Sequence, residues 1–115
     1  MTTNETNQEK TATLNTYFRE LTAGEAIPRP ENEEWEAMIN RIESASGPVE
    51  IDEKTYWYFL ETLPPRFMRE NYFCFAEGSE PYWLFWERDG RYFARRLDWQ
   101  QTKNFSRLAG IRAYC

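Results

Sequence analysis

Residues Asn71–Leu97 read NYFCFAEGSEPYWLFWERDGRYFARRL, and this stretch decides the fold. Three runs of aromatic and aliphatic residues alternate with turn-forming residues, which lie at Gly78–Pro81 and at Asp89-Gly90. Asp-Gly between two such runs predicts a tight hairpin, because the turn needs positive backbone φ angles that these residues tolerate. The stretch therefore predicts a three-stranded antiparallel meander with strands at residues 72–77, 82–88 and 91–97.

Apolar residues at helical spacing predict three helices before this meander and one after it. The first stripe begins at Leu14 and the next two begin at Trp35 and Tyr56, each with three- and four-residue steps. Prolines, glycines and capping residues place the ends of these helices. We expect helices at about Thr13–Ala23, Asn32–Ser44, Asp52–Leu63 and Asp98–Ala109, an extended edge at Pro48–Ile51 and a turn at Arg66–Glu70.

Helices and strands occupy separate blocks of the chain, and this order predicts an α+β fold rather than an α/β fold. A length of 115 residues predicts one domain. Residues 1–12 are polar and have no large apolar side chain after Met1, so we expect a disordered tail there and a single α+β domain at residues 13–115. Aromatic residues make up 17% of the chain, so a small core can still be well filled.

The sequence favours a cytoplasmic protein without a membrane segment. Its N-terminus lacks a basic region followed by an apolar run, and no window approaches the ~18 apolar residues of a spanning helix. The two cysteines, Cys74 and Cys115, lie far apart, which is unlike a disulfide framework. We expect Cys74 to be a small buried hydrophobic residue.

The charge of the chain is unevenly distributed. The net charge is −5, but residues 1–55 carry twelve acids and five bases, whereas residues 56–115 carry seven acids and nine bases. Overall acidity argues against general nucleic-acid binding, which depends mainly on neutralising phosphates. The basic second half leaves a local nucleic-acid contact open.

The residues that commonly carry enzyme chemistry are scarce. The chain has no histidine, which removes the usual general base and the commonest metal ligand. Two isolated cysteines do not make a zinc site, and the five glycines are scattered rather than gathered in a phosphate loop. We therefore expect a protein that is not an enzyme, with no catalytic residues, no metal and no cofactor.

The predicted strands are aromatic on both faces. Alternation along the middle strand places Tyr82, Leu84 and Trp86 on one face, and Trp83, Phe85 and Glu87 on the other. Either helices cover both faces, or one face is an exposed aromatic surface for a partner or a second copy of the chain. On the last strand, Arg91 and Arg95 share one face, while Tyr92 and Arg96 share the other.

The leading hypothesis is a small protein that binds another macromolecule, most readily a protein, through an aromatic and arginine-rich sheet surface. Aromatic residues and arginine are enriched at the centres of interfaces. The candidate binding residues are Trp83, Trp86, Tyr92, Arg91, Arg95 and Arg96, with Arg66 and Arg69 as second choices. The last two follow Pro64-Pro65, in a segment that is either a rigid connector or a presented loop.

Two alternatives rest on charge. The RYFARR run at Arg91–Arg96 is suited to stacking on single-stranded nucleic acid, although pairing of its arginines with Glu77, Glu80 and Glu87 is the simpler explanation. The acids Glu31, Glu33, Glu34 and Glu36 are suited to imitating phosphates, as in an inhibitor of a nucleic-acid enzyme, although a solvated helix start also explains them.

Several segments resemble a family of short bacterial proteins that is known as a domain of unknown function and is often found on proteobacterial plasmids and in phage-related regions. These segments are YWYFLETLPPRFMR (Tyr56–Arg69), FCFAEG (Phe73–Gly78), LFWERDGRYFARRL (Leu84–Leu97), FSRLAGI (Phe105–Ile111) and FRELTAGEAIPRP (Phe18–Pro30). The resemblance implies a bacterial cytoplasmic accessory protein and supplies no activity or site residues.

Overall fold

The computed structural model describes residues 13–76, 78 and 80–111. A helix at residues 13–21 is followed by α2 (Trp35–Ser44), β1 (Val49–Ile51), α3 (Glu53–Thr62), β2 (Phe67–Arg69), β3 (Tyr72–Phe75), β4 (Trp83–Arg88), β5 (Arg91–Arg96) and α4 (Trp99–Ala109). The predicted α+β class is confirmed. The predicted tail at residues 1–12 lies outside the described residues, as do Glu77 and Cys115.

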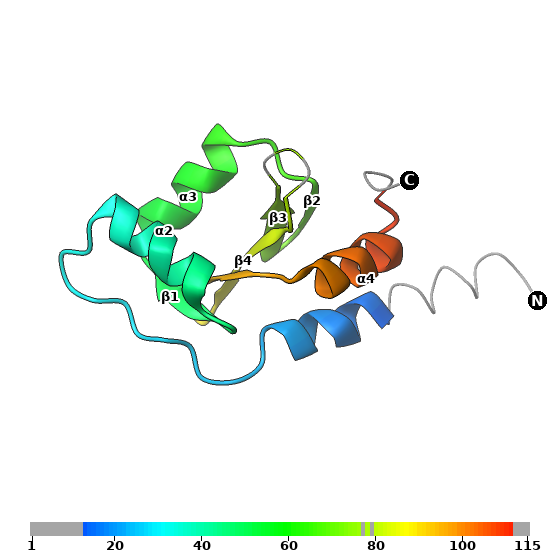
Figure 1. Ribbon diagram of the computed structural model, residues 1–115, viewed down its shortest axis with the longest axis horizontal. Helices are drawn as coiled ribbons and strands as arrows, with labels where there is room; N and C mark the ends of the chain where they lie inside the picture. The colour runs from blue at the N-terminus through cyan, green and yellow to red at the C-terminus, as the bar shows by residue number, and fades with distance from the viewer. Residues whose placement is uncertain (1–12, 77, 79, 112–115) are drawn as a thin grey trace, which may run out of the picture.

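The strands form one antiparallel sheet in the order β1-β5-β4-β3-β2 (Figure 1). The predicted meander is present as β3, β4 and β5, but the prediction of three strands is wrong because the described chain has five. β1 pairs with β5 at one edge of the sheet, and β2 pairs with β3 at the other. β1 lies within the extended edge expected at Pro48–Ile51, whereas β2 lies in the segment expected to be a turn, Arg66–Glu70. Three residues are too short for an alternating pattern to identify a strand.

A two-residue turn sets the register between β4 and β5. Asp89 and Gly90 both have positive φ angles, of 54° and 75°, as a twisted hairpin turn requires. Arg88 therefore lies directly opposite Arg91, and Trp83 lies opposite Arg96 at the far end of the hairpin. This register fixes which side chains meet on each face of the sheet.

Helices cover both faces of the sheet (Figure 1). The helix at residues 13–21 and α4 pack with Leu84, Trp86 and Phe93 on one face. α2 and α3 pack with Phe73, Phe85 and Ala94 on the other face. Of the two sequence-based alternatives, the structure confirms covered faces, and the exposed aromatic sheet face is wrong for the described residues. None of the described helices is long and apolar enough to cross a membrane.

Arg95 joins three separate segments beneath the helices. Its side chain lies within the sheet face under residues 13–21, and the residue is only 9% exposed. Its guanidinium donates to the carbonyl of Leu21 at 2.8 Å and to the carbonyl of Ser46 at 3.2 Å. Burial lowers the pKa of Arg95, although arginine stays charged in proteins. Arg95 therefore ties the first helix and the α2–β1 loop to β5.

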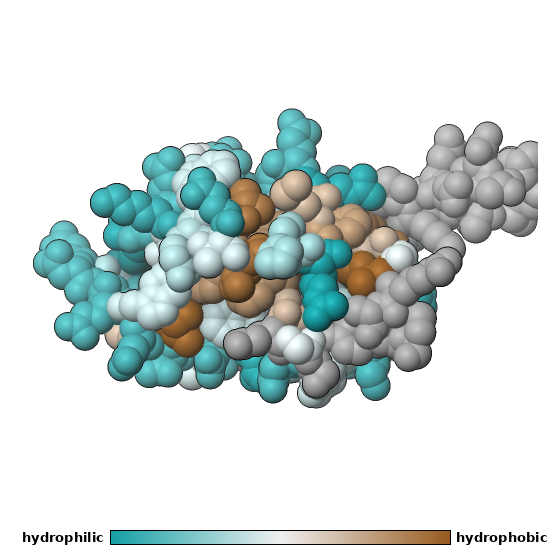
Figure 2. All heavy atoms as spheres, turned by 90° about the horizontal axis from the view of Figure 1, so that it is seen from above, coloured by the Kyte–Doolittle hydropathy of each residue, from teal (hydrophilic) through white to brown (hydrophobic). Residues whose placement is uncertain are grey.

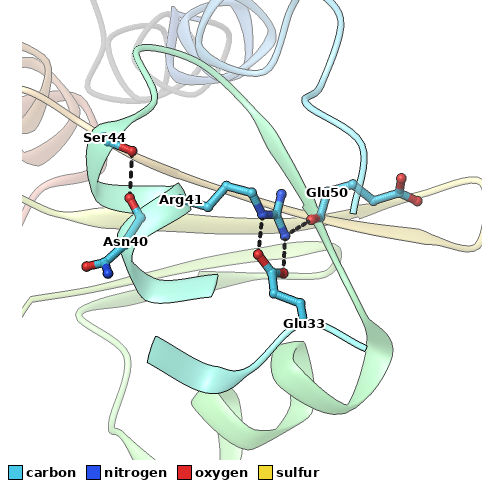
Figure 3. A network of polar contacts seen from close by, with 5 residues as sticks. All are labelled: Glu33, Asn40, Arg41, Ser44 and Glu50. Carbon is cyan, nitrogen blue, oxygen red and sulfur yellow. Dashed lines mark hydrogen bonds and ion pairs between the residues drawn. The ribbon is translucent and has the colours of Figure 1, made fainter. Parts of the chain in front are cut away.

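A second arginine, Arg41, fixes the other side of the molecule (Figure 3). Its Nε and Nη2 donate to the two carboxylate oxygens of Glu33, both at 2.7 Å, and Nη2 also donates to the Glu50 carbonyl at 2.7 Å. Such two-pronged pairs are strong and strictly oriented. The pair connects the segment before α2 with β1.

Side chains cap two of the helices at the predicted positions. Asp52 accepts from the Thr55 backbone N–H at 2.7 Å. Asp98 and Gln101 form a capping box, and Gly110 ends α4 in the left-handed conformation. Burial alone would raise the pKa of Asp52, but the hydrogen bonds from Thr55 and the nearby cations Arg29 and Lys54 outweigh it and lower that pKa.

We expect Arg95→Ala to lower the free energy of unfolding by about 2–4 kcal/mol, because the buried carbonyl of Leu21 and the partly buried carbonyl of Ser46 lose a charged hydrogen-bond donor. Arg69→Ala, at the exposed edge strand, serves as the control and should cost less than about 0.5 kcal/mol. Urea denaturation followed by circular dichroism measures both values. Equal costs for the two variants would show that Arg95 does not join the segments.

Asp52→Ala should lower the free energy of unfolding by about 1 kcal/mol at neutral pH, because the first turn of α3 loses its cap. Because the pKa of Asp52 is lowered in the folded chain, the charged cap stabilises the fold fully at pH values above the ordinary pKa of 3.8. That contribution is lost as the pH falls through the lowered pKa. The difference between wild type and Asp52→Ala should therefore shrink in acid, and a constant difference would contradict this assignment.

Candidate functional site

Trp86 and Arg95 do not belong to an accessible surface. Trp86 is 1% exposed, and its ring stacks on Phe93 at 5.7 Å and meets Phe18 edge-on at 6.4 Å. Both residues were predicted as binding residues, and for an exposed surface that prediction is wrong because the helix at residues 13–21 covers them. The Trp86 ring is part of the core, and the Arg95 guanidinium holds segments of the backbone together.

Trp83 and Arg96 lie at the opposite end of the hairpin and remain partly exposed. Phe75, Trp83 and Arg96 form one row across β3, β4 and β5, because each is the register partner of the next. α3 covers most of this face but ends at Thr62, where Pro64-Pro65 prevents its continuation. The last row of the face is consequently left partly open.

A groove of about 460 Å³ lies over this row, and we call it the Trp83 groove. Its lining comes from the ends of α2 and α3 and from the sheet. The lining residues are Ile39, Glu43, Phe59, Leu63, Phe75, Glu80, Pro81, Trp83 and Arg96. Most of these are apolar or aromatic, as is usual for the floor of a binding site.

A second hollow of about 490 Å³ continues from the groove along the α3–β2 connector. The two share Leu63 and Phe75, and the second adds Pro64, Pro65 and Arg66. Arg66 donates to the Gly78 carbonyl at 3.1 Å, which holds its guanidinium at the margin. Figure 2 shows the molecule from the side on which α3 lies. Hydrophobic residues are exposed in the middle of this view, surrounded by hydrophilic ones.

The rim of the Trp83 groove carries charges of both signs. Nη2 of Arg96 lies 4.0 Å from a carboxylate oxygen of Glu80, and the two side chains are 40% and 68% exposed. Glu43 contributes a second carboxylate from α2. An exposed pair of this kind adds little stability.

Three other predicted residues lie away from the groove. Arg91 forms an ion pair with Glu50 at 3.1 Å, at the hairpin end of β5. Tyr92 packs against Tyr56 with ring centroids 4.9 Å apart. Arg69, on the edge strand β2, holds its guanidinium 5.4 Å from the ring centre of Phe67. Of the eight predicted residues, the structure therefore brings Trp83 and Arg96 together in the Trp83 groove, places Arg66 at the adjoining hollow and separates the others.

The acidic residues named in the sequence have different surroundings. Glu33 is held by Arg41 and its side chain is only 10% exposed, whereas Glu31, Glu34 and Glu36 are exposed. The expected pairing of an arginine with Glu80 occurs at Arg96. Glu87 instead accepts from the Gly90 backbone N–H at 3.2 Å, within the hairpin turn.

Cys74 offers no reactive thiol. It lies inside the sheet with no exposed surface, and burial raises its pKa to about 12. A protonated, buried thiol is a poor nucleophile. This environment agrees with the prediction of a small buried hydrophobic residue. Within the described ranges, no group of three or more Cys, Asp or Glu residues is arranged to hold a metal ion.

Sequence reasoning missed the residues that turn Trp83 into part of a groove. Glu43 comes from α2 and Leu63 from the end of α3, about 40 and 20 positions before Trp83. The proline pair was the available signal, because it shows that α3 stops before it covers the sheet completely. No pattern in the sequence indicates which strands would lie beneath that stop.

Comparison of the chain with protein-family models, with curated proteins and with solved structures finds no match. The resemblance to plasmid- and phage-associated bacterial proteins therefore stays an expectation.

Trp86→Ala and Trp83→Ala should differ sharply in stability. We expect Trp86→Ala to lower the free energy of unfolding by about 3–5 kcal/mol, because it leaves a cavity under the first helix. Trp83→Ala should cost about 1–2 kcal/mol, because this side chain is partly exposed at the groove. Urea denaturation gives both values. If the order is reversed, Trp83 is a core residue and the groove is not a site.

Proposed function

We propose that this chain is a non-enzymatic protein-binding module and that the Trp83 groove receives a segment of a partner protein. The observation that carries the proposal is a partly exposed tryptophan on the floor of an apolar groove, at the place where α3 stops. Tryptophan and arginine are the side chains that most often dominate binding energy at protein interfaces. Trp83 and Arg96 supply this pair here.

The composition of the groove favours a protein segment over nucleic acid. Its rim holds two carboxylates, Glu43 and Glu80, beside the single guanidinium of Arg96. Phosphates would be repelled by this balance, since nucleic-acid affinity depends on an excess of cations. An apolar side chain placed over Trp83, followed by a basic residue near Glu43 or Glu80, fits both the floor and the rim.

The walls of the groove are stiff, and stiffness favours binding. Pro64 and Pro65 fix the path of the connector, and Pro81 fixes the approach to β4. Phe75 and Phe59 support the floor, because their rings stack at 5.3 Å beneath α3. A preformed groove loses little conformational entropy when a partner binds.

The residues of the chain also favour binding over catalysis. The sequence has no histidine, and Cys74 is buried with a raised pKa. No carboxyl group on the rim of the Trp83 groove is enclosed enough to act as a general acid, since the Glu80 side chain is 68% exposed. We therefore assign the groove to recognition.

Affinity capture from the native host, followed by binding measurements on the purified partner, tests this proposal. Trp83→Ala should weaken binding about 30-fold, which corresponds to the ~2 kcal/mol of an interface anchor. Arg96→Ala, at the rim, should weaken it only a few-fold. Trp99→Ala is the control, because Trp99 is a more exposed tryptophan, 45% exposed, and lies on α4 at the other face of the sheet.

A partner that binds Trp83→Ala as tightly as the wild type would contradict the groove. If only Trp99→Ala weakened binding, the interface would lie on the face of the sheet that α4 covers. Sedimentation of the purified chain gives a further check. A dimer that Trp83→Ala converts to a monomer would identify a second copy of the chain as the partner.

A further inference from the structure

Two arginines face each other at the closed end of the β4–β5 hairpin. Arg88 and Arg91 are direct register partners on either side of the Asp89-Gly90 turn, so their side chains project from the same face of the sheet. Like charges placed directly opposite each other in a sheet destabilise it. An anion between the two guanidinium groups would offset this repulsion through charged hydrogen bonds.

Each of the two guanidinium groups is held in position through one of its donors. Nη2 of Arg88 donates at 3.0 Å to the hydroxyl of Thr22, a residue that is only 2% exposed. Nε of Arg91 donates to Glu50 at 3.1 Å, and its guanidinium lies 5.3 Å from the ring centre of Phe93. A guanidinium has five N–H donors, so most donors of both groups remain for a ligand.

A cleft of about 420 Å³ lies beside the arginine pair. One wall is the connector that follows the first helix, including Gly24, Glu25 and Ala26. Trp86 and Phe93, which are nearly buried and stacked on each other, lie beneath the cleft. This volume lies within the usual range for small-molecule sites.

We propose that this cleft binds a small ligand with a single phosphate group, which Arg88 and Arg91 hold between them. The carboxylate of Glu25 lies on the wall of the same cleft and can accept hydrogen bonds from ligand hydroxyl groups. A sugar phosphate or a nucleoside monophosphate presents this combination of one phosphate and several hydroxyls. The apolar lining residues Ala26, Pro28 and Pro48 can contact the carbon skeleton of such a ligand.

The charges around the cleft favour a singly phosphorylated molecule over a polyanion. Glu25 opposes a second phosphate, and Glu50 already neutralises part of the charge of Arg91. The pKa of Glu50 is lowered, mainly by the hydrogen bond from Arg91 and to a smaller extent by Arg29. The net charge of −5 for the whole chain also repels a long nucleic-acid strand.

This site is independent of the Trp83 groove. Arg88, Arg91 and Phe93 lie on the sheet face under residues 13–21, whereas the Trp83 groove lies on the face under α2 and α3. Loss of protein binding would therefore leave phosphate binding unchanged. The reverse also holds.

NMR titration of the uniformly ¹⁵N-labelled chain tests the proposal, with the Gly24 and Gly90 amide signals as local reporters. The probes are ribose 5-phosphate and adenosine monophosphate, with ribose and adenosine as unphosphorylated controls and a single-stranded oligothymidylate as the polymeric source of phosphate. We expect saturable shifts with both phosphorylated probes and none with ribose or adenosine. Arg88→Gln and Arg91→Gln should each weaken the binding about tenfold or more.

Arg69→Gln is the matched control, because Arg69 lies on the edge strand β2 and should leave the affinity unchanged. Arg88→Gln also removes the bond to Thr22, so thermal unfolding must show that the variant is folded. Glu25→Ala provides a test without loss of a cation. Because the acceptor for ligand hydroxyl groups is removed, this variant should weaken the binding of ribose 5-phosphate relative to the binding of inorganic phosphate, which serves as a further probe.

No response to either phosphorylated probe at millimolar concentration would overturn the proposal. Equal affinity in Arg69→Gln and in the two cleft variants would show that binding occurs elsewhere. Binding of the oligothymidylate without binding of the two small probes would replace a small-molecule site with a nucleic-acid contact, and the proposal would then be wrong.

Discussion

Burial of the sheet on both faces is the constraint on which the rest of this structure depends. All four residues of β3 are buried, and Leu84, Phe85 and Trp86 of β4 are each no more than 1% exposed. Side chains alternate between faces, so such strands place large apolar groups on both sides and need a helical layer on each. The chain meets this need with the first helix and α4 on one face, and with α2 and α3 on the other.

Both proposed sites lie where this double cover is incomplete. At one end of the hairpin, α3 ends over the row of Phe75, Trp83 and Arg96, where the proline pair follows it, and Trp83 and Arg96 stay partly exposed. At the other end, the first helix has ended, and only the connector after Thr22 passes over Arg88 and Arg91. Covered regions provide the rigid support, and the uncovered ends provide accessible side chains. A rigid layer with irregular margins commonly carries binding sites in this way.

The arginines illustrate how one residue type takes several roles within a small domain. Arg95 connects segments that are distant in sequence, whereas Arg41 connects Glu33 and Glu50, which lie eight and nine positions away from it. Nη1 of Arg41 and Nε of Arg95 are buried without a protein partner in the described chain. Arg96 and Arg91 stay at the surface, where their charges are accessible. Burial, which depends on the covering helices, separates the structural arginines from the others.

The sequence by itself determined the α+β class, the β3–β5 meander, the Asp89-Gly90 turn and the approximate extents of the helices, because these follow from local spacing and turn chemistry. It also determined which side chains of β4 and β5 share a face, since alternation is a property of the strand alone. Only the tertiary structure decided that Trp86 and Arg95 are buried while Trp83 and Arg96 are partly exposed. These four residues have the same local pattern. Their exposure depends on where helices from distant parts of the chain come to rest, and that position depends on packing across the whole domain rather than on neighbouring residues.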